Sequence, residues 1–268
     1  MIAAGERWEW EPNMDNVAQK AHAPGGEAAD KDAAATGEVV RQPRQRDPER
    51  TRRAILDAAT AEFVAHGFAG ASVNEIAARA KVNKRMLYHY YGKKDDLYLA
   101  VLERSYKGIR TAERELRLTD LPPRAAIERL VLFTWGYFLE HPEFLSLLNS
   151  ENMLRGRYLR QSSHIRDLHS PLISMMRHVL DRGAAEGVFR KGVDPVQLYV
   201  SIASLGFFYL SNRYTLSTIF ERDLMDAAQL AERGQHIVDV ILGYLSCDAG
   251  VATEEVSPRS AKHKPNSS

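Results

Sequence analysis

Hydrophobic residues recur with the period of an α-helix along nearly the whole chain between about residues 47 and 247. No stretch alternates apolar and polar residues as a half-buried strand would, and glycine and proline fall where the helical stretches end. The pattern therefore predicts an all-α fold. We expect about nine helices, over residues 48–66, 73–80, 84–91, 94–116, 122–141, 143–159, 171–186, 195–214 and 226–246.

The second and third of these helices are short and are separated by a tight turn, which is the arrangement of a helix-turn-helix motif. Ser72 and Asn83 stand at the positions of N-terminal caps. Leu87 and Tyr91 are four residues apart, so we expect them to share the buried face of the third helix. The two N-termini are also suited to accept phosphate groups.

This packing leaves a polar face of the third helix exposed, formed by Lys84, Arg85, Tyr88 and His89. Arginine and lysine can read guanine in the major groove, and a tyrosine hydroxyl can hold a phosphate. The sequence therefore predicts a DNA-binding module. Packing of the same motif against another protein is the alternative.

Charge is distributed unevenly along the chain, although the total is only +1. Residues 1–40 carry a net charge of −5, residues 41–94 carry +7, and residues 95–268 carry −1. A basic segment beside a nearly neutral body is typical of a phosphate-binding module. A basic face that only meets solvent is the other interpretation of charge alone.

Residues 1–46 and 248–268 have few large apolar side chains, and we expect both segments to be disordered. Arg41, Arg44 and Arg46 precede the first helix and form either an arm that reaches the minor groove or a basic linker. A further hypothesis is that translation starts at Met14 or later.

The remaining features point to a cytoplasmic protein that is not an enzyme. The single cysteine, Cys247, excludes a disulfide framework, and no signal peptide or membrane-spanning stretch is recognisable. The chain has no phosphate-binding loop, dinucleotide fingerprint or nucleophile elbow. Its histidines lack the spacing of metal ligands. We therefore expect no cofactor, no metal and no membrane partner.

The stretch from Ser72 to Ala80, followed by Val82-Asn83-Lys84, 87–91 and 94–97, resembles the signature of the tetracycline-repressor (TetR) family. The resemblance covers about residues 50–98. It implies that the helix 84–91 reads DNA, that Tyr88 and Lys94 contact phosphates, and that the protein is a homodimer. The sequence differs from the family pattern at Lys81, where glycine is usual, and at Arg85-Met86, where two small residues are expected.

These arguments divide the chain into four parts: 1–46 as an extension, 47–93 as a helix-turn-helix domain, 94–247 as a helical effector-binding and dimerisation domain, and 248–268 as a tail. The predicted DNA-binding residues are Arg46, Arg52, Ser72, Asn83, Lys84, Arg85, Met86, Tyr88, His89 and Lys94.

The larger domain carries aromatic, methionine and polar side chains on otherwise apolar helices. An apolar cavity with a few convergent polar groups is the usual form of a small-molecule site. Each residue alone is better explained as core or surface, but the resemblance to TetR proteins favours an effector site. Its predicted residues are Trp135, Phe138, Asn149, Asn152, Arg155, Met176 and Phe208.

Two apolar stripes near the C-terminus are candidates for the dimer interface that the resemblance implies. They are Leu198, Ile202, Leu205 and Tyr209, and then Ile237, Val238, Ile241, Leu242 and Leu245. Packing of the two stripes inside one subunit is the alternative.

The C-terminal half resembles regulators of nicotinate and related aromatic-acid breakdown, in the stretches 141–144, 151–152 and 212–217. We therefore expect a dimeric repressor that binds a palindromic operator and is released by a small effector, such as an aromatic or heteroaromatic acid. The alternatives are a helical protein-interaction module, or an activator without effector-driven release.

Overall fold

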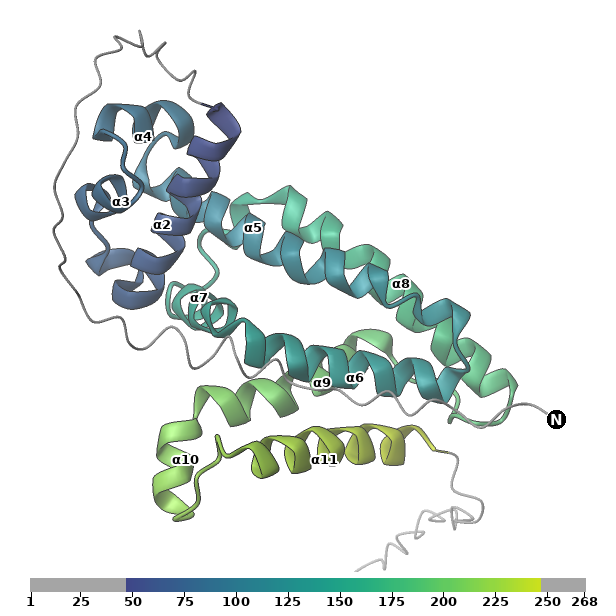
Figure 1. Cartoon of the computed structure of the whole chain (residues 1–268). Coiled ribbons are helices and arrows are strands. Elements are labelled where there is room, and N and C mark those ends of the chain that lie inside the picture. The colour runs from purple at the N-terminus through teal and green to yellow at the C-terminus, as the bar shows by residue number, and fades with distance from the viewer. Residues whose placement is uncertain (1–46, 247–268) are drawn as a thin grey trace, which may run out of the picture. The chain divides into compact units, whose positions relative to one another are not determined.

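The structure of the chain, a computed structural model, describes residues 47–246, except for the side chains of Arg166, Leu168, His169 and Ser170. This part contains ten α-helices and two short 3-10 helices (Figure 1). They are α2 (Pro48–Gly70), α3 (Val73–Arg79), α4 (Lys84–Tyr91), α5 (Lys94–Glu115), η1 (Leu118–Asp120), α6 (Pro123–Glu140), α7 (Pro142–Met153), η2 (Leu159–Gln161), α8 (Ser163–Ala185), α9 (Pro195–Ser211), α10 (Arg213–Ile219) and α11 (Ala227–Leu245). The all-α prediction is confirmed.

The chain divides into two compact units. Among the described residues, the first comprises 47–109 together with Gly136–Ile165, and the second comprises Arg110–Trp135 and 166–246. This division differs from the predicted boundary between residues 93 and 94, because α2 packs against α7 within the first unit. None of the described helices combines the length and apolar character needed to cross a membrane.

Helix α2 begins where the sequence predicts it. The Asp47 carboxylate accepts the Glu49 N–H at 3.0 Å, and Pro48 occupies the first turn. The predicted end at residue 66 falls one residue before Gly67, whose φ of 63° interrupts the helix. Glycine adopts this left-handed conformation without a steric penalty. One further turn then carries α2 to Gly70.

The core of the first unit contains four aromatic rings, from Phe63, Phe68, Tyr98 and Tyr158. Centroid distances of 4.9 to 5.2 Å join Tyr98 to Phe63, Phe68 and Tyr158 in edge-to-face contacts. The Tyr158 hydroxyl donates to Asp95 at 2.9 Å, and burial raises the pKa of this phenol to about 12. The cluster therefore ties α2, α5 and the segment after α7 together.

Helix α7 ends at Met153, so the predicted end at residue 159 is wrong. Arg155 and Gly156 both have positive φ, 57° and 67°, and the chain turns there. The buried Glu151 carboxylate stabilises this turn by accepting the N–H groups of Tyr158 at 2.7 Å and Leu159 at 3.0 Å. Buried backbone N–H groups need hydrogen-bond acceptors, and where the helix has ended this carboxylate supplies them.

Two other helix boundaries differ from the prediction. Helix α8 starts at Ser163 rather than at Pro171, which lies inside it. A proline within a helix removes one backbone hydrogen bond, and the turns on either side keep theirs. Helix α9 ends at Ser211, and a separate helix, α10, follows after Asn212. The separate α10 raises the number of α-helices in the described residues from the nine expected to ten.

In the second unit α9 packs against α11. The side chains of Leu198, Ile202 and the whole predicted α11 stripe are buried within the single chain. Leu205 and Tyr209, the other members of the predicted α9 stripe, are half-buried, and for them the prediction is not tested. The seven buried residues are not available to a dimer interface. They form the core between two helices of one subunit, since each stripe faces the other.

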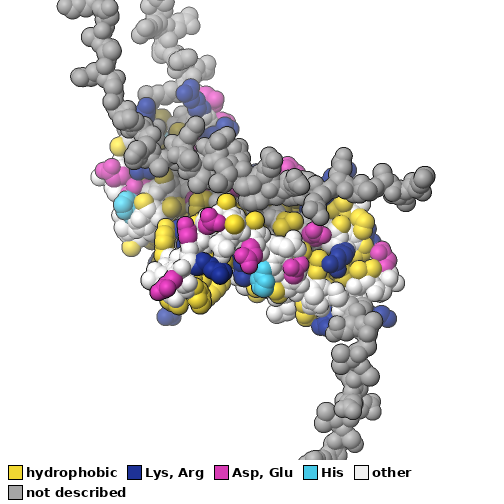
Figure 2. Space-filling view, turned by 60° about the horizontal axis from the view of Figure 1, so that its bottom comes forward, with side chains coloured by type: hydrophobic (Ala, Val, Ile, Leu, Met, Phe, Trp, Pro, Cys, Tyr) yellow, Lys and Arg dark blue, Asp and Glu magenta, His cyan; other side chains and the backbone are white. Residues whose placement is uncertain are grey.

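A second apolar stripe on each of these helices is exposed. On α9 it includes Val196, Val200 and Phe208, and on α11 it includes Val240 and Tyr244. Figure 2 brings the side of the molecule with α10 and α11 forward and shows hydrophobic side chains between charged ones. Spacings of four and eight residues place the members of each stripe on one helix face.

An ion pair is buried in the second unit. The Arg110 guanidinium lies 2.7 Å from a Glu113 carboxylate oxygen, and both side chains are only 1% exposed. Arg110 also donates to the Tyr199 hydroxyl at 2.7 Å. Burial raises the pKa of Glu113 to about 7, and the Arg110 charge opposes that rise.

The turn between α3 and α4 places Lys81 in the left-handed region, with φ of 55°. The Val82 N–H donates to the Ala77 carbonyl at 3.0 Å, and the Lys81 N–H donates to the Ala78 carbonyl at 3.1 Å. These two bonds define a Schellman motif. At the position of Lys81 this motif usually has glycine. The turn therefore has a conformation that favours glycine, with a lysine side chain in its place.

We expect Lys81→Gly to stabilise the chain by about 0.5–1 kcal/mol, because glycine relieves the left-handed strain at the cost of greater freedom in the unfolded chain. Urea unfolding measures the change. Lys81→Ala is the matched control, since it removes the same charge and keeps the strain. Equal stabilities of the two variants would contradict the argument.

Candidate DNA-binding surface

Helix α4 is held by its apolar face. Leu87 is fully buried against the motif, where Ile76 and Ala77 of α3 are buried as well. The Tyr91 hydroxyl donates to the Arg52 carbonyl of α2 at 3.1 Å, and burial raises the pKa of this phenol, so it stays a donor. These contacts fix the direction in which the opposite face of α4 points.

That opposite face is exposed and basic. Lys84, Arg85, Tyr88 and His89 are all exposed, Tyr88 by 43%. The Lys84 ammonium lies 5.8 Å from the centre of the Tyr88 ring, which keeps both side chains on one side of the helix. We call these four residues the recognition face. It combines two cations, a phenol and an imidazole without a carboxylate among them.

The two predicted caps are used inside the motif. Asn83 accepts the Met86 N–H at 2.8 Å, and Ser72 accepts the Glu75 N–H at 3.4 Å. The Ser72 N–H in turn donates at 3.0 Å to the carboxylate of Glu62, which is buried in α2. Both cap side chains therefore position α3 and α4, and a phosphate contact by either of them stays a prediction. Met86 is half-buried.

Lys94 is turned toward the end of α2. Its ammonium donates to the Ala71 carbonyl at 2.6 Å and to the Ala69 carbonyl at 3.4 Å, and it lies 5.0 Å from the centre of the Phe68 ring. A lysine ammonium has three donors, so one is left for the phosphate contact that the family resemblance implies.

Arg52 lies on α2 beside α4. Its guanidinium is 5.6 Å from the centre of the Tyr90 ring and 4.0 Å from the Glu49 carboxylate, and the side chain is exposed. A phosphate contact by Arg52 stays a prediction. Arg46, like the rest of the predicted basic arm, lies outside the described residues.

The residues predicted for effector binding are dispersed. Trp135 and Met176 are buried in the second unit, and the Trp135 indole donates to the Leu230 carbonyl at 3.2 Å. Phe208, also in the second unit, is 58% exposed. In the first unit Phe138 is buried, with its ring 6.1 Å from that of Phe144.

The three polar members of that predicted set lie on the surface of the first unit. Asn149 and Asn152 are exposed, because the buried face of α7 is the one that carries Phe144 and Glu151. Arg155 is exposed in the turn after α7. The Asn152 amide donates to the Leu148 carbonyl one turn earlier. These three side chains therefore do not supply the polar contacts of a buried effector site in this structure.

The first unit does contain a cavity that sequence reasoning missed. Its lining is Thr60, Arg104, Ser105, Gly108, Tyr137, His141, Glu143 and Phe144. None of the seven predicted effector residues lines it. The sequence offers one signal, the His141-Pro142-Glu143-Phe144 stretch, but Arg104 and Ser105 are separated from it by more than 30 residues.

Comparisons with known proteins identify relatives that are DNA-binding regulators. Residues 55–101 match the tetR family of bacterial regulatory proteins, and residues 123–241 match the tetracyclin repressor-like C-terminal domain. The chain is 39% identical over 199 residues to the HTH-type transcriptional repressor NicS of Pseudomonas putida, covering 74% of this chain and 94% of that protein.

Other relatives are more distant. The repressor SCO4008 of Streptomyces coelicolor is 38% identical over 116 residues, which are 41% of this chain and 54% of that protein. The structure of the ketosteroid transcriptional regulator KstR2 of Mycobacterium tuberculosis superposes with a TM-score of 0.56 at 19% identity, over 76% of this chain and 98% of that chain. This similarity concerns the fold alone.

The fold, the exposed basic helix of a helix-turn-helix motif and these matches define a DNA-binding transcription regulator. The chain belongs to the TetR family of bacterial regulators. The matched families and relatives are regulators rather than enzymes, which confirms that prediction.

Proposed function

We propose that the protein is a homodimeric repressor that binds a palindromic operator and is released by a small organic effector. The observation that carries this proposal is the recognition face of α4, exposed and free of acidic side chains. A dimer presents two such faces about 34–36 Å apart, and so requires two half-sites one helical turn apart. We propose repression rather than activation because NicS, which aligns with 74% of this chain, is a transcriptional repressor.

Release by an effector requires that the ligand prefer the state with weaker DNA affinity. For a roughly 100-fold loss of operator affinity, that preference amounts to about 2.7 kcal/mol. Helix α5 follows the motif directly, and Lys94 at its start contacts the end of α2. Movement of α5 is therefore the route by which we propose that an effector changes the separation of the two recognition faces.

The experiment is selection of bound fragments from sheared genomic DNA by the purified chain, with and without candidate organic acids. We expect one short palindrome to be enriched and the enrichment to fall when one acid is present. The log–log salt slope of its affinity should change by roughly −0.9 for each phosphate neutralised. Enrichment no better than random DNA would support the protein-interaction alternative.

The activator alternative has one observation in its favour. The chain is 36% identical over 90 residues to the transcriptional activator FasR of Mycolicibacterium smegmatis. A reporter gene placed behind the selected operator separates the two functions. Deletion of the regulator raises expression if it is a repressor and lowers expression if it is an activator.

We expect Val200→Glu combined with Tyr244→Glu to yield a monomer. These side chains are 49% and 48% exposed on the second stripes of α9 and α11, so the charges cost little in the free chain but would be buried between two copies. Light scattering should give the mass of one chain, with operator affinity reduced at least about 100-fold. The matched control is Met153→Glu, which changes an exposed methionine in the first unit. A double variant that stays dimeric would place the interface elsewhere.

A further inference from the structure

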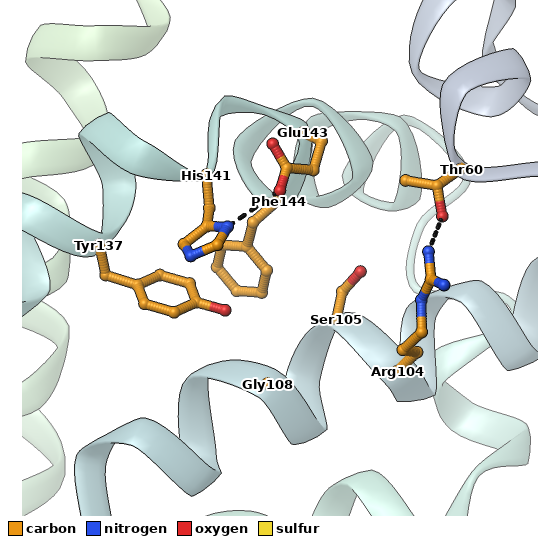
Figure 3. A pocket seen from close by; sticks show the side chains of 8 residues that line it. All are labelled: Thr60, Arg104, Ser105, Gly108, Tyr137, His141, Glu143 and Phe144. Carbon is orange, nitrogen blue, oxygen red and sulfur yellow. Dashed lines mark hydrogen bonds and ion pairs between the residues drawn. The ribbon is translucent and has the colours of Figure 1, made fainter. Parts of the chain in front are cut away.

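A cavity of about 140 Å³ lies within the first unit, bordered by α2, α5, the end of α6 and the start of α7 (Figure 3). Its volume is close to that of a cavity that holds a single benzene ring, roughly 150 Å³. Tyr137, His141 and Phe144 lie on one side, and Thr60, Ser105 and Arg104 lie on the other. We call these sides the aromatic end and the polar end.

The polar end is built around Arg104. Its guanidinium donates to the Thr60 hydroxyl at 2.7 Å, to the Asp57 carboxylate at 2.6 Å and to the Leu56 carbonyl at 3.3 Å. Ser105, the next residue on α5, points its hydroxyl into the cavity. Guanidinium and hydroxyl donors side by side are the groups that recognise a carboxylate.

The aromatic end offers flat apolar surfaces. The His141 ring lies 4.1 Å from the Tyr137 ring, and the Phe144 ring lies 6.1 Å from that of Tyr137. Gly108 keeps this end open, because a Cβ there would stand only 3.1 Å from the Tyr137 hydroxyl oxygen. Ring surfaces in such an arrangement favour an aromatic ligand in stacked or edge-to-face geometry.

We propose that this cavity binds a small aromatic carboxylic acid, with its carboxylate against Arg104 and Ser105 and its ring at the aromatic end. One acidic group, Glu143, also lines the cavity. It lies 3.0 Å from His141 Nδ1, at the end away from Arg104. The ligand's negative charge therefore meets the guanidinium rather than this carboxylate.

Occupancy would act on α2. A ligand carboxylate competes with Asp57 and Thr60 for Arg104, and Asp57 is 63% exposed, so water can replace the lost ion pair. These are contacts between α5 and α2, the helix whose Glu62 holds the N-terminus of α3. This consequence rests on the proposed function, whereas binding to the cavity does not.

Calorimetric titration of the full chain tests binding with three probes of one ring and different charge: benzoate, benzyl alcohol and benzylamine. Benzoate is expected to bind at least about tenfold more tightly than the other two, because only it pairs with a guanidinium. In Arg104→Gln this preference should fall to about twofold or less, while Arg104→Lys should keep part of it. Equal binding of all three, tighter binding of benzylamine, or no benzoate binding at millimolar concentration would overturn the proposal.

A second variant tests the location. Ser105→Leu fills the cavity and should abolish benzoate binding, whereas Ser146→Leu makes the same change on α7 outside the lining. Circular dichroism confirms that both variants are folded. Benzoate affinity in Ser105→Leu equal to that of the unchanged chain would overturn the cavity proposal.

The outcomes separate the two proposals. If genomic selection recovers an operator while Ser105→Leu still binds benzoate, the proposed function stands and the cavity proposal fails. If benzoate binding follows the expected pattern while no operator is recovered, the cavity proposal stands and the proposed function fails.

Discussion

Replacing Arg85 with alanine is expected to weaken operator binding by about 2–6 kcal/mol, which is a factor of roughly 30 to 10⁴. A bidentate arginine–guanine contact contributes about 1–3 kcal/mol, and a dimer makes the contact twice. Arg85 is exposed on the recognition face, and its neighbour Met86 is held by the Asn83 cap, so the change should leave the fold intact. Fluorescence anisotropy with the selected operator measures the loss.

The control for charge alone is Arg129→Ala, which removes an exposed arginine from α6 in the second unit. It should change operator affinity by less than about twofold, since Arg129 does not belong to the recognition face and an exposed charge is screened by salt. Affinity of Arg85→Ala for random DNA should fall far less than affinity for the operator. Equal losses on both DNAs would show that Arg85 holds a phosphate rather than reading a base.

The second large effect concerns stability and pH. Glu113 has a pKa of about 7 in the folded chain, raised by burial from an ordinary value of 4.5. Between these two values the folded state holds a proton that the unfolded state has lost, so the free energy of unfolding falls as pH rises. The contribution of this group amounts to roughly 3 kcal/mol between pH 4.5 and 7.

Urea unfolding over this pH range gives the free energy of unfolding of the unchanged chain and of the variant Glu113→Gln, and the effect is the difference between them. Glu113→Gln keeps the shape of the side chain and cannot titrate, so its stability should fall less steeply with pH than that of the unchanged chain. Arg110 and Tyr199, the charged and phenolic groups in contact with this site, are the same in both proteins. Parallel pH profiles would show that Glu113 does not titrate in this range.

The helix-turn-helix could be predicted from sequence because its determinants are local. Helix α4 has the predicted bounds, and the caps Ser72 and Asn83 make the predicted kind of bond to N–H groups three residues later. The turn at Lys81 keeps its geometry without glycine because two backbone bonds close it. Apolar side chains four residues apart, such as Leu87 and Tyr91, lie on one helix face. The inward face of a helix can therefore be predicted from its own sequence.

The partners of each helix in the larger part of the chain could not be predicted in this way. An amphipathic stripe shows that a face is buried, but the stripe with Leu198 and Ile202 gave no indication whether α11 or a second subunit covers it. Helix α7 ends early because Glu151 reaches forward to the N–H of Tyr158, an interaction that periodicity does not contain. The cavity is lined by both Arg104 and His141, which face the same space only after α5, α6 and α7 have packed.

The recognition face has a consequence for how such a regulator can diversify. Lys84, Arg85, Tyr88 and His89 are exposed, while the packing of α4 depends on Leu87 and on the bond from Tyr91 to α2. If these four residues read the operator as proposed, substitutions among them change the preferred DNA sequence and leave the stability of the fold nearly unchanged. Duplicated copies of such a gene can acquire new target sequences in single steps, each through a folded intermediate. A library randomised at these four codons should consist mostly of folded proteins with altered target preference.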